Sequence, residues 1–219
     1  MYIQDKVIVI AGGASGLGLA TARYMVHDKG ARVALLDLDV NAGEAAVSEL
    51  GVESALFVRT DVGDEDSVRV AIDAVVARFG KVHVCINSAA PPAQVSSARF
   101  TAKCVEQMAR NAPDIGEERG VVIHISPSAI DEDQTGARAA RALGEVGVWV
   151  NAIVPGLFLT PTTASLGEPT RSALMAQIGA PKRFGDMREF AHCCAFIIEN
   201  GYLNAETIRL DAASHLRAG

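Results

Sequence analysis

The chain has 219 residues, of which 49% are hydrophobic and 21% charged, and its formal net charge is −6. This length fits one domain with a full core, and the apolar share excludes a disordered chain. The acidic balance offers no electrostatic footprint for nucleic acid or an anionic membrane, and no apolar run is long enough to span a bilayer. We therefore expect a single domain over residues 1–219 that partners neither nucleic acid nor membrane.

Short apolar runs alternate with segments of helical periodicity, which is typical of a doubly wound parallel sheet in an α/β fold. The predicted strands are 6–11, 31–37, 54–58, 82–87, 120–126, 147–153 and 206–210. The predicted helices are 16–29, 41–50, 64–79, 98–111, 136–144, 170–178 and 187–199. Asp64 or Gly63 is expected to cap the third helix and Gly80 to end it. Right-handed crossovers then place helices on both faces and a ligand site at the carboxyl ends of the strands.

The first strand runs into a glycine-rich turn and then a helix, as in a Rossmann-type dinucleotide site. Gly12 allows the turn, Gly16 lets the backbone approach a pyrophosphate, and Gly18 lets helix and strand pack closely. The helix N-terminus presents unpaired N–H groups to the phosphates. Asp37 stands nineteen residues after Gly18, where it can accept hydrogen bonds from the adenosine ribose. These features predict a dinucleotide site, with an ordinary tight turn as the alternative.

The cysteines and histidines do not follow the pattern of a metal site or a disulfide framework. The four cysteines are Cys85, Cys104, Cys193 and Cys194. Their spacing matches neither pattern, so we expect buried free thiols in a reducing, cytoplasmic compartment. The five histidines are scattered along the chain, and we expect no metal.

Several separated motifs, in the right order, resemble the short-chain dehydrogenase/reductase family over nearly the whole chain. They are the glycine motif at 12–18, with Ala11 where threonine is usual, then Asp61-Val62, the turn at 87–90, and the segment 151–156 followed by Thr160-Pro161. Residues 155–158 and 208–211 look closest to the type-2 3-hydroxyacyl-CoA dehydrogenase branch of that family.

The resemblance implies a nicotinamide dinucleotide as the cofactor. We expect NAD, because the Asp37 carboxylate would repel a 2′-phosphate and no Arg or Lys stands in the glycine turn or directly after Asp37. The cofactor-binding residues that the motifs imply are Gly12, Ser15, Gly16, Leu17, Gly18, Asp37, Asp61, Val62, Asn87, Pro155, Gly156 and Thr160. Two of them have a plain structural alternative: Asp61 as a helix-capping acid, and Thr160 as a turn hydroxyl beside Pro161.

The chemistry that the resemblance implies rests on a tyrosine, a lysine four residues later, a serine and an asparagine. The lysine lowers the pKa of the tyrosine, which exchanges a proton with the substrate oxygen. In this chain the tyrosines are Tyr2, Tyr24 and Tyr202, and no lysine occurs between positions 104 and 181. The Tyr-x-x-x-Lys pair of the fifth helix is therefore absent.

The serine of the family is replaced at its aligned position, and the asparagine of the fourth helix has no clear counterpart. The alignment of the fifth strand puts Pro127 at the serine position, flanked by Ser126 and Ser128. A one-residue bulge would bring either serine into place; the alternative is a polar strand end. Asn111 lies beside Pro113 and is expected to end the fourth helix.

Two further groups are weak candidates for the proton donor. Asp131 lies in the acidic loop 131–133, where a carboxylate beside a nicotinamide in a dry cleft would have a raised pKa. The alternative is a solvated loop that caps the next helix. His124 alternates with apolar neighbours, so it is either a satisfied core histidine or a general base.

The fourth and fifth helices are expected to be shortened. Residues 129–147 suffice for a crossover but not for the long helix that carries the family's Tyr-Lys pair, and 88–119 are short of a full fourth helix. Because the resemblance implies that these helices build the dimer interface, we expect any homo-oligomer to have an altered interface.

Three functional hypotheses follow. The first is an NAD-dependent oxidoreductase acting on a small-molecule secondary alcohol or ketone, including a 3-hydroxyacyl thioester. The second is a catalytically impaired or inactive NAD-binding protein, such as a sensor, a scaffold or a shortened isoform. The third is a different NAD-assisted reaction, an epimerisation or elimination that uses the acidic loop.

Overall fold

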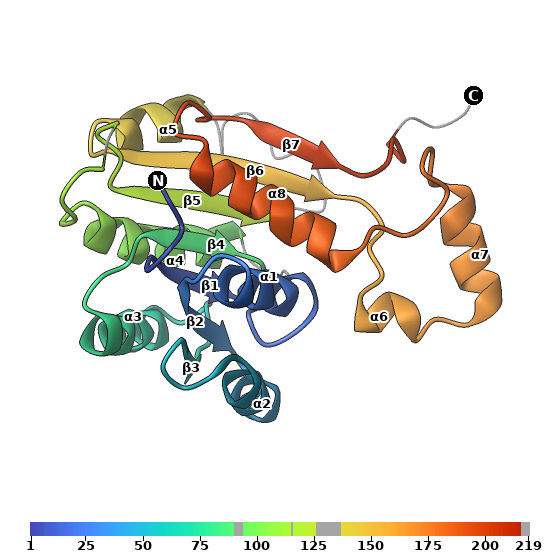
Figure 1. Ribbon diagram of the computed structural model, residues 1–219, viewed down its shortest axis with the longest axis horizontal. Coiled ribbons are helices and arrows are strands. Elements are labelled where there is room, and N and C mark those ends of the chain that lie inside the picture. The colour runs from blue at the N-terminus through green and yellow to red at the C-terminus, as the bar shows by residue number, and fades with distance from the viewer. Residues whose placement is uncertain (90–93, 115, 126–136, 216–219) are drawn as a thin grey trace.

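The computed structural model describes residues 1–89, 94–114, 116–125 and 137–215. Among these residues, seven strands form one parallel sheet in the order β3-β2-β1-β4-β5-β6-β7 (Figure 1). The strands are β1 (Val7–Ala11), β2 (Arg32–Asp37), β3 (Ala55–Arg59), β4 (Val84–Asn87), β5 (Gly120–Ile125), β6 (Val148–Pro155) and β7 (Thr207–Leu210). The chain steps outward from β1 to β3 and then from β4 to β7, which confirms the predicted doubly wound sheet.

The helices in the described part of the chain agree with the predicted ones in order and differ at their ends. They are α1 (Gly16–His27), α2 (Val40–Leu50), α3 (Glu65–Phe79), α4 (Gln94–Met108), α5 (Ala137–Gly144), α6 (Pro161–Ala164), α7 (Glu168–Ala176) and α8 (Met187–Glu199). The four-residue helix α6 was not predicted, because one turn is too short to show a hydrophobic period. At eight residues, α5 is a short crossover helix.

The sheet is buried on both faces. Ile10 and Ile86 belong to the cluster that packs against α1 and α8, whereas Val9 and Cys85 belong to the cluster under α3 and α4. In Figure 1, α1 and α8 cross the nearer face of the sheet. Because strands buried on both sides read as continuous apolar runs, the core could be located from the sequence.

The third helix has the ends that the sequence predicts. The Asp64 carboxylate accepts hydrogen bonds from the backbone N–H groups of Asp66, at 2.8 Å, and Ser67, at 3.1 Å. Gly80 ends the helix in the left-handed conformation, with φ +81°. These contacts satisfy backbone groups that an uncapped helix leaves unpaired.

Asn111 has a different role from the predicted helix stop. The helix ends at Met108, and Asn111 is buried beyond it. Its side-chain amide donates to the carbonyl of Val82 at 2.7 Å and to that of Arg119 at 2.9 Å. Asn111 thus joins the residues that precede β4 and β5, two segments that are distant in sequence.

His83 ties the start of β4 to the start of β1. Its Nδ1 accepts the backbone N–H of Val7 at 3.0 Å. Burial, together with the positive charges of Lys6, Lys81 and Arg32, lowers the pKa of His83 to about 4. The imidazole is therefore neutral at physiological pH, as its acceptor role requires.

This pKa predicts an acid-sensitive fold. An unfolded histidine titrates near 6.5, so as the pH falls the unfolded chain binds the proton before the folded chain does. The free energy of unfolding should be greatest above pH 6.5 and decrease as the pH falls toward 4. Urea unfolding at pH 7 and pH 5 would measure the loss. In His83→Asn the side-chain oxygen still accepts the Val7 N–H without titrating, so the loss should be smaller; an equal loss in both proteins would contradict the assignment.

Candidate cofactor site

The glycine turn between β1 and α1 is packed tightly on its inner side and open on its outer side. A Cβ at Gly18 would lie 2.1 Å from the carbonyl oxygen of Gly12, and a Cβ at Gly12 would lie 2.8 Å from that of Ser88. Gly12 and Gly16 also have positive φ angles, of +71° and +51°, which favour glycine. A Cβ at Gly16, by contrast, would meet nothing within 4 Å. The backbone is therefore accessible at Gly16.

The N-terminus of α1 has the properties of an anion site. Ser15 occupies the N-cap position without a side-chain hydrogen bond to the helix, and the first turn contains no acidic residue. The first N–H groups of a helix have no partner within it, and the helix dipole adds positive potential there. An exposed Ser15 hydroxyl and these N–H groups could together hold a phosphate.

Asp37 connects the end of β2 to this turn. Its Oδ2 accepts the backbone N–H of Ala14 at 3.1 Å, and its Oδ1 accepts that of Leu38 at 2.8 Å. The side chain is half-buried. Oδ1 also accepts the backbone N–H of Asp39 at 3.3 Å. Because Oδ2 has a second acceptor direction, the carboxylate can hold the turn and still accept a hydrogen bond from a diol.

The pairing of β2 with β3 also places a cation beside Asp37. Arg59, at the end of β3, is in register with Asp37 and is exposed. Side chains in register on neighbouring parallel strands point to the same face of the sheet. Arg59 therefore bears on the choice between NAD and NADP, since a guanidinium pairs well with phosphate.

Asp61 forms a turn at the end of β3 and does not cap α3. Its Oδ1 accepts the N–H of Gly63 at 2.8 Å, while its own N–H donates to the Ser67 hydroxyl at 3.0 Å. Asp64 supplies the cap instead. The neighbouring Val62 is partly buried against the cluster under α3 and α4. The helix-cap alternative for Asp61 is therefore wrong.

Asn87 and His124 end up side by side at the carboxyl ends of β4 and β5. They are in register with each other, and Asn87 is also in register with Ala11 of β1. Asn87 is buried, and burial lowers the pKa of His124. The candidates Ser126, Ser128 and Asp131, together with the rest of the acidic loop 131–133, lie outside the described residues.

Pro155 and Gly156 end β6 against the end of β7. The N–H of Gly156 donates to the carbonyl of Leu210 at 2.9 Å, and a Cβ at Gly156 would lie 2.5 Å from the Cα of Asp211. Glycine is required here by close packing. Gly156 therefore fixes the spacing between the segment expected at the nicotinamide and the loop after β7.

Thr160 is the N-cap of α6. Its hydroxyl accepts the N–H of Thr163 at 3.3 Å, and the Thr163 hydroxyl accepts the N–H of Thr160 at 2.7 Å. This reciprocal pair is a capping box, with Pro161 in the first turn. The Thr160 hydroxyl therefore has a structural role as a helix cap, close to the alternative of a turn hydroxyl, and its role in cofactor binding stays a prediction.

None of the three tyrosines lies at the carboxyl ends of the strands. Tyr2 precedes β1 and Tyr202 precedes β7, both at the opposite edge, and they are 79% and 101% exposed. Tyr24 lies on α1 and faces α8, where its ring packs edge-on to His192 and under the guanidinium of Arg188. No tyrosine is available at the proposed nicotinamide position.

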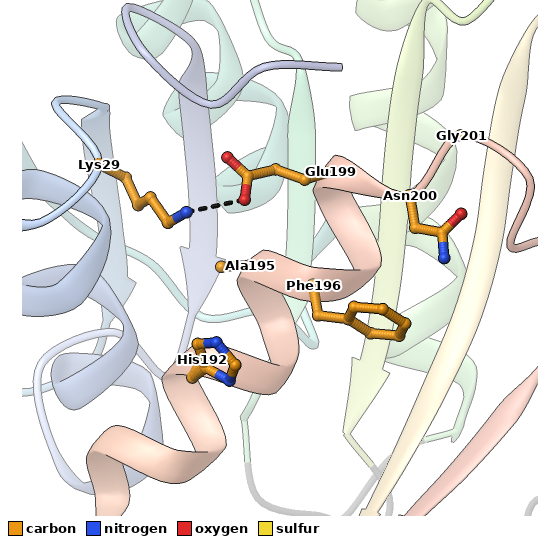
Figure 2. A pocket seen from close by; sticks show the side chains of 7 residues that line it. All are labelled: Lys29, His192, Ala195, Phe196, Glu199, Asn200 and Gly201. Atoms are coloured by element: carbon orange, nitrogen blue, oxygen red, sulfur yellow. Dashed lines mark hydrogen bonds and ion pairs between the residues drawn. The ribbon is translucent and has the colours of Figure 1, made fainter.

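An open hollow of about 400 Å³ lies beside α8. Figure 2 shows the side chains around it. The hollow is lined by Lys29, His192, Ala195, Phe196, Glu199, Asn200 and Gly201. Lys29 and Glu199 form an ion pair across it, at 2.7 Å. Lys29 lies beyond the far end of α1, which is about 18 Å long, so the hollow is separate from the glycine turn. Within the described ranges, no group of three or more His, Cys, Asp or Glu side chains could hold a metal ion.

Comparison with known proteins decides the family. The profile of the short chain dehydrogenase family matches residues 6–112. Human 3-hydroxyacyl-CoA dehydrogenase type-2 is 35% identical over 257 aligned positions, which cover 98% of this chain and 97% of that protein. This chain belongs to the short-chain dehydrogenase family. The crystal structure of 3-hydroxyacyl-CoA dehydrogenase type-2 from Mycobacterium avium superposes with a TM-score of 0.84, at 31% identity over 97% of this chain and 96% of that one.

As a short-chain dehydrogenase, the chain is shorter than the relatives it resembles. The alignment with the human protein runs over 257 positions, although this chain has 219 residues and nearly all of both proteins is covered. The relative therefore contains internal segments that have no counterpart here. The eight residues of α5 agree with a loss in the helix expected to carry the Tyr-Lys pair.

The close approach at the glycine turn can be tested by substitution. In Gly18→Ala the new methyl group would collide with a backbone carbonyl that cannot rotate away, so the free energy of unfolding should fall by about 1–3 kcal/mol. Gly167→Ala, before α7, is the matched control, because a Cβ there would make only an ordinary contact, 3.9 Å from Pro169, and its φ of −61° suits alanine. Thermal unfolding should show the larger loss at Gly18; a larger loss at Gly167 would contradict the packing argument.

Proposed function

We propose that this chain binds NAD(H) along the carboxyl edge of the sheet and slowly transfers hydride between the nicotinamide and a secondary alcohol or ketone. The observation that carries the proposal is the glycine turn, open at Gly16 and bonded at Ala14 to the Asp37 carboxylate. When bound, the nicotinamide would supply the hydride chemistry.

The residues proposed to hold the cofactor fall into three groups along this edge. The pyrophosphate would be held by Ser15, Gly16, Leu17 and Gly18, with Gly12 behind them. Asp37 would hold the ribose diol, and Asp61 and Val62 would border the adenine. The nicotinamide end would be surrounded by residues that lie at or after the carboxyl ends of β4 and β6. These are Asn87, Pro155, Gly156 and Thr160.

The relatives suggest the class of substrate. The mammalian relatives at 32–35% identity are named 3-hydroxyacyl-CoA dehydrogenases. We therefore propose 3-hydroxyacyl thioesters and the matching 3-ketoacyl thioesters as the first substrates to test. The four cysteines are free thiols, which supports a reducing compartment such as the cytoplasm. No helix in the described part of the chain is long and apolar enough to cross a membrane.

A second candidate function is NAD(H) binding without turnover. The positions of the tyrosines favour it, because none of the three can reach a substrate at the carboxyl edge. The two candidates make the same prediction for cofactor binding and opposite predictions for hydride transfer.

Cofactor binding should depend on Asp37. Loss of a charge-assisted hydrogen bond costs about 1.5–3 kcal/mol, so Asp37→Ala should weaken NADH binding by roughly 10- to 100-fold. NADPH should gain relative to NADH, because Arg59 can then pair with the 2′-phosphate. Asp39→Ala removes a nearby carboxylate that caps α2 and should leave NADH binding unchanged. NADH fluorescence titration measures all three proteins; unchanged affinity in Asp37→Ala would overturn the adenosine assignment.

Turnover distinguishes the two candidate functions. With NADH and acetoacetyl thioester, we expect measurable oxidation of NADH at a lower rate than that of a short-chain dehydrogenase with its tyrosine, because the Tyr-x-x-x-Lys pair that tunes the family's proton donor is absent. Absorbance at the NADH band follows the reaction. Binding without oxidation would favour the second candidate, and failure to bind either NADH or NAD would refute both.

A further inference from the structure

Asp211 and His215 form a hydrogen-bonded pair in the loop directly after β7. The Nδ1 of His215 lies 2.6 Å from Oδ2 of Asp211. The same carboxylate accepts the backbone N–H groups of Ala213, at 3.0 Å, and His215, at 3.2 Å. The side chain of Asp211 is 9% exposed and that of His215 is 40% exposed. The result is an oriented imidazole with a buried carboxylate behind it and one face toward solvent.

The loop lies between the proposed nicotinamide segment and the segment that bears α7. On one side, Asp211 packs against Gly156, where a Cβ would meet its Cα at 2.5 Å. On the other side, the carbonyl of Ala212 accepts the N–H groups of Gly179, at 3.0 Å, and Ala180, at 3.1 Å. Figure 1 shows this loop at the same edge of the sheet as the end of β6. Asp211 thus packs directly against Gly156, a residue of the segment expected to contact the nicotinamide.

The backbone of the loop is strained, and the contacts around it hold the strained conformation. Ala212 and Ala213 have φ angles of 51° and 60°. A residue with a Cβ rarely adopts this left-handed region, because its Cβ comes too close to the backbone carbonyl oxygen. Such strain persists only where the surroundings hold it, here through Asp211, Gly179 and Ala180.

The chemistry of the pair suits proton transfer. Burial opposes the charge on Asp211, but the hydrogen bonds from His215 and Ala213 outweigh it and hold the pKa of Asp211 below its usual range. The carboxylate is therefore ionised at neutral pH, and it fixes the proton of the imidazole on Nδ1. The Nε2 atom of His215 is left to exchange a proton with another group.

We propose that His215, oriented by Asp211, carries the substrate proton in this chain, in place of the absent tyrosine; the proposal rests on the NAD(H)-dependent function above. In the oxidising direction the alcohol O–H bond breaks and its proton goes to Nε2. A bound nicotinamide would take the hydride from the carbon that bears the hydroxyl group, so that the alcohol becomes a ketone and NAD becomes NADH. The imidazolium then releases its proton to water, and reduction runs these steps in reverse.

The decisive variant is His215→Asn, because the asparagine amide can still donate to Asp211 from the position of Nδ1 but has no counterpart of Nε2. We expect kcat/KM to fall by about 10²-fold or more, while the melting temperature and NADH affinity stay unchanged. Added imidazole should restore part of the rate. His192→Asn changes an exposed histidine on α8 and should have no effect. Asp211→Asn should lower kcat in the parent protein but not in His215→Asn, as expected of a positioning residue.

A second measurement tests the location of His215 without relying on turnover. Diethyl pyrocarbonate modifies accessible imidazoles, and mass spectrometry gives the rate at each site. Bound NADH should slow the modification of His215 severalfold and leave that of His192 unchanged. Equal rates at His215 with and without NADH would overturn the proposal.

The outcomes separate this proposal from the function on which it rests. If the parent protein binds NADH but His215→Asn keeps full turnover, or if no turnover occurs at all, the role of His215 is wrong and cofactor binding stands. If the parent protein binds neither NADH nor NAD, the proposed function fails, and the role of His215 fails with it.

Discussion

The missing side chain at Gly18 is the constraint on which the rest of this architecture depends. A Cβ there would lie 2.1 Å from the Gly12 carbonyl, so only glycine lets α1 begin directly against the end of β1. That contact aims the unpaired N–H groups of α1 along the carboxyl edge. It also brings Ala14 to 3.1 Å from the Asp37 carboxylate of β2. The proposed phosphate site and the proposed diol acceptor therefore both depend on one close packing contact.

The two halves of the carboxyl edge differ in which residues of the family's site they contain. On the side of β1 and β2, the glycine turn and Asp37 have the geometry on which the proposed dinucleotide site rests. On the side of β5, none of the three tyrosines, all of which lie in the described part of the chain, is at the carboxyl edge. Binding and proton transfer depend on different elements, so a chain can lose one while the sheet and the other stay intact. The strands that bracket the loss, β5 and β6, remain paired along their length.

The loop after β7 offers a way to reconcile a cofactor site with the missing acid. An Asp–His pair separates two tasks, since the carboxylate orients the ring and the ring exchanges the proton. In this chain the carboxylate is buried against Gly156 and the imidazole is partly exposed. Ala212, which lies between Asp211 and His215, accepts hydrogen bonds from the segment before α8. A movement of the loop would therefore change the geometry of the pair and that of the proposed nicotinamide end together.

By itself, the sequence determined the sheet, the order of its elements, the glycine turn and the acid at the end of β2, because these follow from local patterns. Strands buried on both faces give apolar runs, and the caps Asp64 and Gly80 act within one turn of the chain. Only the tertiary structure decided the roles of Asn111, His83 and Arg59, whose partners or neighbours are distant in sequence. The Asp211–His215 contact spans four residues, but its place beside Gly156 depends on the pairing of β6 with β7. Local propensity cannot predict such contacts, since they form only when the packed sheet brings separate segments together.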